Sequence, residues 1–349
     1  MKILVTGGLG FIGSNFIRHI DKVRKNFTVV NLDKQTYAGN PANLDGIKIK
    51  TVKRDICDAK AVDAAMKGAD YVVHFAAETH VDRSILDPEA FLRTGVLGVH
   101  VLLEAVLREA NRTRAGDRAT APRFLQVSTD EVYGDIPEGR SVETDGLAPR
   151  SPYAAAKAAG ELLVGAYHVT YGLDTVISRG SNTYGPYQHP EKLIPLFVTN
   201  ALAGEPLPMY GDGMQVRDWL HVSDHAAGIE FVLRHGEAGE AYNVAGGAEL
   251  PNREVIRRLL AAAGRDWSLV RTVPDRPGHD RRYAMDASKL AALGWRPRVR
   301  FEDGLPETVA WYRDHPDWVA GARSGDWAAY YARQYDDRLA AGRTVDEAG

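Results

Sequence analysis

Two short groups of residues in this chain could carry out a reaction together. Thr129 is followed by the adjacent carboxylates Asp130 and Glu131, and Tyr153 is followed four positions later by Lys157. Paired carboxylates can divide the roles of general acid and general base. An ammonium group near a tyrosine lowers the tyrosine pKa, so that the phenolate can take an alcohol proton as hydride leaves the carbon. Together the two groups predict hydride transfer combined with loss of water.

Each group also has a plainer explanation. The stretch Thr129–Glu131 follows an apolar run and could be a solvated turn or a helix cap. The Tyr153 and Lys157 side chains share one helix face at this spacing, but such pairs also arise by chance on surfaces. The chemical interpretation therefore depends on a cofactor site elsewhere in the chain.

A glycine-rich turn near the start of the chain supplies that context. Gly7, Gly10 and Gly13 directly follow an apolar strand pattern and open a helical pattern. Such glycines allow a tight turn and bring backbone amides close to a pyrophosphate. Asp33 ends the next strand pattern, where a carboxylate bonds the adenosine ribose diol and repels a 2′-phosphate. We therefore predict NAD as the cofactor in preference to NADP, although Lys34 beside Asp33 is a counter-signal.

Two further segments are placed to meet the same cofactor. Asp55 and Ile56 follow the third strand pattern and could frame the adenine, while Asp55 could equally cap a helix. Phe75, Ala76 and Ala77 end the fourth strand pattern with small residues where a cofactor would cross the sheet edge.

The elements that must position these residues alternate between short apolar runs and helical patterns. This alternation favours an α/β fold, a Rossmann-type doubly wound parallel sheet with a smaller mixed α/β substrate-binding domain. We expect an NAD-binding domain over residues 1–180 with a return segment near 214–240, a second domain over 181–335, and a frayed polar tail over 336–349. The expected strands are Lys2–Thr6, Thr28–Leu32, Ile47–Lys53, Tyr71–Phe75, Phe124–Ser128 and Thr175–Arg179, and the expected helices are Gly13–Lys25, Ala59–Met66, Thr94–Ala110, Pro152–Tyr171 and His221–His235.

Composition excludes several classes of function. The 349 residues carry a net charge of −3, which provides no basic field for nucleic acid or for an anionic membrane. The single cysteine, Cys57, excludes an internal disulfide. No metal site is expected, because His80 and His279 lack partners at metal-ligand spacing. We see no apolar run of membrane-spanning length and no room for a signal peptide before the first strand, so we expect a cytoplasmic protein.

Several long motifs resemble the extended short-chain dehydrogenase/reductase superfamily, and more closely its dTDP-glucose 4,6-dehydratase family. The similarity extends from Met1 to about Tyr312. Its most specific segments are His74–Ser84, Ser128–Gly134, Tyr184–Gln188, Glu191–Pro195, Gly211–Val222 and Asp275–Arg282.

The resemblance implies a three-stage reaction on a nucleotide-linked hexose, with dTDP-glucose as the expected substrate. Tyr153 would take the proton of the 4-hydroxyl as hydride passes from C4 to NAD. Glu131 would then remove the C5 proton while Asp130 protonates the departing 6-hydroxyl, and hydride would return to C6. Thr129 would bond the 4-oxygen, and Lys157 would also hold the nicotinamide ribose.

The resemblance also implies two sets of binding residues. Arg217 and Arg276 would meet the phosphates, and Pro208 and Tyr210 would flank the base. The cofactor set is Gly7, Gly10, Phe11, Ile12, Gly13, Asp33, Lys34, Thr36, Asp55, Ile56, Phe75, Ala76, Ala77, Thr79, Thr94, Tyr153, Lys157 and Asn182. The substrate set is Thr79, Thr129, Asn182, Lys192, Leu193, Pro208, Tyr210, Arg217, Asn252, Arg276 and His279.

Three residues depart from the common family pattern. Gly180 and Thr183 stand where larger or amide side chains are expected, and His189 replaces an expected aromatic residue. These departures bear on local packing and on the grip on substrate, and they leave the catalytic residues unchanged.

Alternative functions stay open at this point. A dehydratase for a UDP-, CDP- or GDP-hexose would share most of these residues. A nucleotide-sugar 4-epimerase would need Tyr153 and NAD but no pair of carboxylates, and a decarboxylase would place a substrate carboxylate against Asp130. A non-catalytic protein that binds NAD or sugar nucleotides is the alternative from another class. The small and apolar residues of Thr94–Ala110 and Pro152–Tyr171 predict a homodimer, or else ordinary packing on the sheet.

Overall fold

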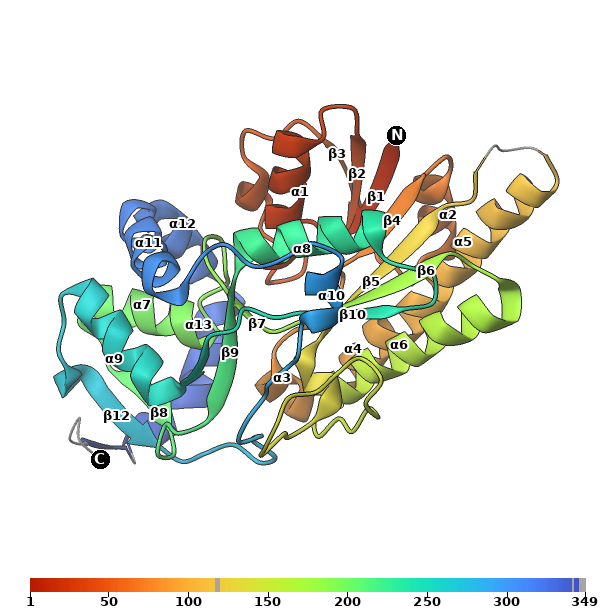
Figure 1. The fold of residues 1–349 in the computed structure, drawn as a ribbon. Coiled ribbons are helices and arrows are strands. Elements are labelled where there is room, and N and C mark those ends of the chain that lie inside the picture. Colours follow the sequence, from red (N-terminus) through yellow and green to blue (C-terminus); the bar gives the residue numbers. More distant parts are fainter. Residues whose placement is uncertain (117–119, 341, 345–349) are drawn as a thin grey trace.

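A seven-stranded parallel sheet forms the centre of the larger lobe in the computed structural model (Figure 1). The strand order is β3-β2-β1-β4-β5-β6-β10, so the strand order reverses beside β1. Open parallel sheets bind ligands at such a point, outside the carboxyl ends of the strands. The strands are β1 (Lys2–Thr6), β2 (Thr28–Asp33), β3 (Lys50–Lys53), β4 (Tyr71–His74), β5 (Arg123–Thr129), β6 (Thr175–Gly180) and β10 (Ala241–Val244).

Helices cover both faces of this sheet. On one face α1 (Phe11–Val23) and α8 (Val222–His235) bury residues such as Phe16 and Ile229 against the strands. On the other face α2 (Ala59–Met66), α5 (Val99–Arg114) and α6 (Pro152–Tyr171) form a second apolar cluster with the sheet. The solid Val, Ile and Leu runs of the strands follow from this burial on both faces.

The smaller lobe contains two three-stranded sheets and its own core. One sheet has the order β11-β9-β7 and the other β13-β12-β8. Its strands are β7 (Asn182–Tyr184), β8 (Leu207–Tyr210), β9 (Val216–His221), β11 (Glu249–Pro251), β12 (Val270–Val273) and β13 (Arg343–Thr344). Its larger helices α7 (Leu193–Ala203), α9 (Asn252–Ala263) and α11 (Phe301–Asp314) lie together on the left of Figure 1 and share one apolar cluster.

Short helices complete the two lobes. They are η1 (Pro41–Leu44), α3 (Val81–Leu86), α4 (Pro88–Leu92), η2 (Arg93–Gly98), η3 (Asp130–Tyr133), η4 (Trp267–Leu269), α10 (Ser288–Ala292), α12 (Pro316–Ala322), α13 (Asp326–Tyr331), η5 (Ala332–Asp336) and α14 (Asp337–Ala340).

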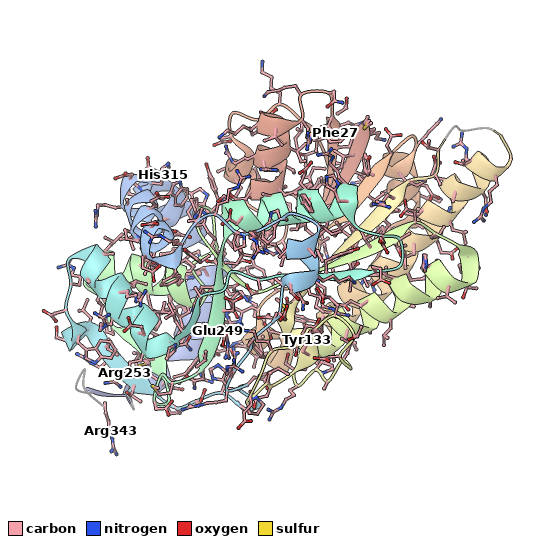
Figure 2. The ribbon with its side chains drawn as sticks, viewed as in Figure 1. Phe27, Tyr133, Glu249, Arg253, His315 and Arg343 are labelled. Carbon is pink, nitrogen blue, oxygen red and sulfur yellow. The ribbon has the colours of Figure 1, made fainter. Side chains whose placement is uncertain are left out.

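The chain crosses between the lobes more than once. After β9 in the smaller lobe it returns to the large sheet through α8 and β10, and Leu290 of α10 packs there again. Figure 2 labels Glu249 of β11 and also Tyr133 of η3, whose hydroxyl donates to Asn243 of β10 in the large sheet at 2.8 Å. The Glu249 carboxylate accepts hydrogen bonds from Arg140 at 2.7 Å and from Arg282 at 2.6 Å.

The structure describes residues 1–116, 120–340 and 342–344. The expected helices Ala59–Met66 and Pro152–Tyr171 have the predicted bounds, while the strand expected at Ile47 begins at Lys50. The tail differs from the expected frayed end, because Asp337–Ala340 is helical and Arg343–Thr344 pairs with β12. Residues 341 and 345–349 of the predicted tail lie outside the described residues.

One helical stretch, which the sequence analysis did not single out, is long and apolar enough to span a membrane by length and composition alone. Pro88–Arg114 is 27 residues long and contains an 18-residue window with a mean hydropathy of 1.6, of which 39% is buried. Leu102, Leu103 and Val106 of this stretch are fully buried against the sheet. Packing in the larger lobe therefore accounts for part of this apolar character.

Candidate active site

The glycine turn lies where β1 passes into α1. Gly7 has a φ of +73°, and a β-carbon there would lie 2.6 Å from the backbone of Ala76. A β-carbon at Gly13 would lie 2.4 Å from the Gly7 carbonyl oxygen. Because no side chain fills the turn, the backbone at the start of α1 faces the cavity at the edge of the sheet. This cradle fits a pyrophosphate.

Asp33 lies beside this turn at the end of β2. Its carboxylate accepts hydrogen bonds from the backbone N–H of Leu9 at 2.9 Å and of Gln35 at 2.7 Å. Burial outweighs these bonds and raises the pKa of Asp33. Lys34 forms an ion pair with Asp55 at 3.0 Å. The Lys34 ammonium, which argued against the preference for NAD over NADP, is thus paired with a carboxylate of the protein.

One cavity collects the whole predicted cofactor set and all the predicted catalytic residues. Every residue of both sets, from Gly7 to Asn182, lines its wall. The wall extends from the glycine turn, past the carboxyl ends of β4 and β5, to α6 and the β6–β7 segment. The cavity therefore connects the predicted dinucleotide site with the predicted catalytic site.

Tyr153 and Lys157 lie in the first turns of α6. Ser151 caps this helix by accepting a hydrogen bond from the backbone N–H of Ala154 at 3.1 Å, and Pro152 occupies its first turn. The Lys157 ammonium donates to the carbonyl of Val127 at 2.5 Å, and burial lowers the pKa of Lys157 to about 8.

The expected lowering of the Tyr153 pKa is wrong for the protein chain alone. Burial and the neighbouring Glu131 carboxylate raise the Tyr153 pKa, and a hydrogen bond to Thr129 only partly opposes them. The positive nicotinamide ring of a bound NAD would favour the phenolate.

Asp130 and Glu131 lie in η3, directly after β5. The Thr129 hydroxyl donates a hydrogen bond to Asp130 Oδ1 at 3.0 Å, while the buried Asp130 Oδ2 has no partner. Burial and the neighbouring Glu131 raise the pKa of Asp130 to about 8. Burial also raises the Glu131 pKa, but the cations Lys192, Arg276 and Arg217 oppose this shift. The two carboxyl groups therefore have unequal surroundings, because three cations oppose the shift at Glu131 while the neighbouring Glu131 carboxylate adds to the shift at Asp130.

The predicted substrate residues separate into two groups. Thr79, Thr129, Asn182, Lys192 and Leu193 line the cavity. The other six do not, and the structure places them in the smaller lobe beside it: Pro208, Tyr210, Arg217, Asn252, Arg276 and His279.

Two of these six are arginines whose charge acts on Glu131. Arg217 is 5% exposed and donates to the carbonyls of Val216 and Asp280, and its guanidinium lies 4.2 Å from the Tyr283 ring centre. Arg276 donates to Asp82 at 3.2 Å. Two cations are thus held on the smaller-lobe side of the acid pair.

The remaining four residues have contacts of their own. Pro208 pairs with Arg271 between β8 and β12. The backbone N–H of Asn252 donates to the carbonyl of Gln215 at 2.9 Å. The His279 ring lies 2.6 Å from the carboxylate of Asp275, and burial together with the nearby Arg276 and Arg217 lowers the His279 pKa to about 4.

Tyr210 contacts the C-terminal segment, which sequence reasoning did not connect with the site. The Gln334 amide donates to the Tyr210 hydroxyl at 2.9 Å and to Asp82 at 3.0 Å. The Tyr335 ring stacks on Tyr210 with centres 6.3 Å apart, and the Arg338 guanidinium lies 5.2 Å from the Tyr210 ring centre. The sequence around residues 334–338 does not predict these contacts, because Gln334 and Tyr210 are more than 120 positions apart in the chain.

Other cavity residues were also missed. Most adjoin predicted residues or lie within the motifs named above, as Trp219 does in Gly211–Val222, and could have been found by extending each predicted set. His225 comes from α8 and lies outside all of those motifs. The missed residues are Ala38, Gly39, Glu78, Val127, Ser128, Gly180, Ser181, Thr183, Gln188, His189, Glu191, Ile194, Trp219 and His225. Within the described residues no group of three or more His, Cys, Asp or Glu side chains could hold a metal ion.

The chain matches a known protein family over most of its length. The family model described as GDP-mannose 4,6 dehydratase matches residues 4–308. A curated dTDP-glucose 4,6-dehydratase from Streptomyces niveus is 52% identical, with 94% of this chain and 97% of that protein covered.

Solved structures show the same similarity. DesIV, a dTDP-glucose 4,6-dehydratase from Streptomyces venezuelae with NAD and TYD (dTDP) bound, is 50% identical with a TM-score of 0.87, covering 92% of this chain and all of that one. A UDP-glucose 4-epimerase from Thermus thermophilus in complex with NAD is 34% identical with a TM-score of 0.81, covering 90% of this chain and 99% of that one. The fold is therefore shared by dehydratases and epimerases.

Proposed function

The chain belongs to the GDP-mannose 4,6 dehydratase family, and we propose that it converts dTDP-glucose to dTDP-4-keto-6-deoxyglucose and water. The reaction would proceed by oxidation at C4, elimination across C5 and C6, and return of hydride to C6. Its product would enter deoxysugar biosynthesis.

The observation that carries this proposal is the pair Asp130 and Glu131 beside Tyr153 on one cavity wall. A 4-epimerase needs the tyrosine and the cofactor but has no use for a neighbouring acid and base. The unequal surroundings of the two carboxyl groups support one proton donor and one proton acceptor, which an elimination of water requires.

NAD, when bound, would accept hydride from C4 of the hexose and return it to C6. Tyr153 would take the 4-hydroxyl proton while Thr129 bonds the 4-oxygen. The new carbonyl acidifies the C5 proton, which Glu131 would remove as Asp130 protonates the departing 6-hydroxyl. Lys157 is held by the Val127 carbonyl at the same edge of the sheet and would bond the nicotinamide ribose.

The binding sets predicted from the sequence complete the proposal. Residues 1–180, with the return near 214–240, would hold NAD, and residues 181–335 would hold the sugar nucleotide. Asp33 would bond the adenosine ribose diol and exclude a 2′-phosphate. Arg217 and Arg276 would bind the diphosphate, since guanidinium groups match phosphate geometry. Pro208, Tyr210, Asn252 and His279 would contact the nucleoside.

The choice of thymine as the base rests on individual relatives. The family model names a GDP-mannose enzyme, whereas the similar proteins named above are dTDP-glucose 4,6-dehydratases. At 50–52% identity these relatives favour thymidine over guanosine or uridine.

We also propose a cytoplasmic homodimer. The support for the dimer is an exposed apolar pair on α6, where Leu162 is 67% and Val169 is 84% exposed. A second copy of the same face would cover these side chains.

The test is a turnover experiment with a panel of nucleotide sugars. Purified protein is incubated with dTDP-, UDP-, CDP- and GDP-glucose and with GDP-mannose, and products are identified by NMR. We expect a 4-keto-6-deoxy sugar from dTDP-glucose, with deuterium placed at C4 appearing at C6. Formation of a 4-epimer, or NAD binding without any product, would overturn the proposal in favour of an epimerase or a binding protein.

A further inference from the structure

A buried ion pair connects the two ends of the cavity. Arg83 of α3 donates through Nε to the Glu191 carboxylate at 3.0 Å, and the Glu191 side chain is only 1% exposed. The Tyr37 hydroxyl donates to the same carboxylate at 3.0 Å. A buried carboxylate bound by a guanidinium and a hydroxyl has a defined position, because releasing either partner leaves its charge uncompensated.

Two aromatic rings hold the guanidinium of this pair. The Arg83 guanidinium lies 3.8 Å from the ring centre of Tyr37 and 4.1 Å from that of Tyr330. Such stacking requires a planar cation, which arginine provides and lysine does not. We call Tyr37, Arg83, Glu191 and Tyr330 the clamp.

The clamp residues adjoin residues of the cavity wall at both ends. Tyr37 stands between Thr36 and Ala38, which line the part of the cavity that begins at Asp33. Glu191 directly precedes Lys192, the cation that faces Glu131 at the other end. A displacement of the loop after β2 would therefore reach the catalytic end through the hydrogen bond from Tyr37 to Glu191 and the peptide bond from Glu191 to Lys192.

Lys192 is itself fixed from the same side. Its ammonium donates to the Thr79 carbonyl at 2.5 Å, and the His80 ring nitrogen Nε2 lies 3.0 Å from the Glu191 carbonyl. The ammonium of Lys192 and the backbone of Glu191 are thus held by two adjacent residues, Thr79 and His80.

His189, one of the departures from the family pattern, belongs to this environment. Its ring meets Tyr37 edge-on at 5.5 Å, and its Nδ1 lies 3.9 Å from the Glu191 carboxylate. The His189 imidazole therefore packs against the Tyr37 ring, as an aromatic residue would at this position. It also places a ring nitrogen near the Glu191 carboxylate.

We propose that the clamp couples the two ligands: a dinucleotide seated against residues 33–39 holds Tyr37, and through Glu191 it holds Lys192 where the sugar nucleotide binds. The clamp residues are positioning residues, and the inference rests on the proposed function. An ion pair with a purely structural role would stabilise the fold but would not link the two binding events.

The experiment measures the rate at which the holoenzyme loses NAD during dialysis, with and without saturating dTDP. In the wild type we expect dTDP to slow NAD loss about fivefold or more, as typical coupling energies imply. Tyr37→Phe keeps the ring over Arg83 but removes the hydroxyl, and we expect the dTDP effect to fall below about twofold. Arg83→Lys keeps the charge without the planar group and should have the same effect.

Tyr167→Phe is the matched control, because the Tyr167 hydroxyl also donates to a glutamate, Glu104 at 2.6 Å, outside the cavity wall. It should keep the wild-type ratio of the two rates. An equal dTDP effect in Tyr37→Phe and wild type, or no dTDP effect in the wild type, would overturn the coupling, while turnover of dTDP-glucose would still support the proposed function. Failure of wild-type protein to bind dTDP in calorimetry would overturn both.

Discussion

A β-carbon on Gly180 would lie 2.4 Å from the Cε1 and Nε2 atoms of the His225 ring. The His225 Nδ1 lies 2.7 Å from the Thr183 hydroxyl, so two departures from the family pattern meet at one imidazole. His225 is 1% exposed and lines the cavity. Gly180 makes room for this ring, and Thr183 bonds it.

Gly180→Ala should therefore destabilise the protein. The added methyl group must displace a buried ring, and such overpacking costs about 1–3 kcal/mol. Thermal unfolding of the variant should show a lower Tm than the wild type. Gly321→Ala is the control, since no atom lies within 4 Å of a β-carbon there. In a His225→Ala background the cost of Gly180→Ala should shrink, and an undiminished cost would show that the ring is not the obstacle.

Glu131→Gln should stop the reaction after the first hydride transfer. The amide cannot take the C5 proton, so kcat should fall by about 10²–10⁴-fold. The near-ultraviolet absorbance of NADH should accumulate after dTDP-glucose is added. Tyr153→Phe is the comparison, because it should block oxidation itself and give no NADH signal. Turnover without NADH accumulation in Glu131→Gln would assign the C5 proton to another group.

Asp130 should make the elimination sensitive to alkali. Its pKa is raised to about 8, so the proton that it would donate is lost as pH rises through that value. The rate of product formation should decline on the alkaline side in the wild type. Asp130→Asn should be slow at every pH and should lack a decline near pH 8, measured by NMR of the ketosugar. An unchanged alkaline limb in this variant would assign the titration to a different group.

The same shift predicts how stability depends on pH. The folded-state pKa of about 8 lies above the ordinary value of 3.8, so the folded protein binds this proton more tightly than the unfolded chain. The stabilising contribution is complete below the ordinary value and is lost as pH rises toward about 8. Between these pH values the wild-type Tm should therefore fall relative to that of Asp130→Asn. A constant difference in Tm would contradict the raised pKa.

Leu162→Arg should separate the proposed dimer. Leu162 is 67% exposed on α6, so an arginine is tolerated in a monomer but would bring like charges together in a symmetric pair. Sedimentation at micromolar concentration should change from dimer to monomer with little change in secondary structure. Leu293→Arg is the control at a position that is 42% exposed outside α5 and α6. A monomeric wild type would remove the basis for this proposal.

The sequence predicted the larger lobe better than the smaller one for a physical reason. The apolar runs at β1, β2 and β6 and the capped helix α6 are local patterns, and the catalytic side chains adjoin them in sequence. The surroundings of Tyr210 depend on contacts with Gln334 and Tyr335, which no periodicity links to residue 210. The expected effect of Lys157 on Tyr153 also failed, because the Val127 carbonyl binds the ammonium and burial dominates the phenol.

The placement of β10 at the edge of the large sheet has a consequence for synthesis on the ribosome. About 60 residues separate the end of β6 at Gly180 from the start of β10 at Ala241, and most of them belong to the other lobe. At about 5–20 residues per second the nascent chain waits on the order of 3–12 s with the edge of β6 unpaired. An open strand edge is a template for aggregation. The interval between β6 and β10 is thus a period in which another chain can pair with the β6 edge, and slow codons in that interval should lower the soluble yield of the protein.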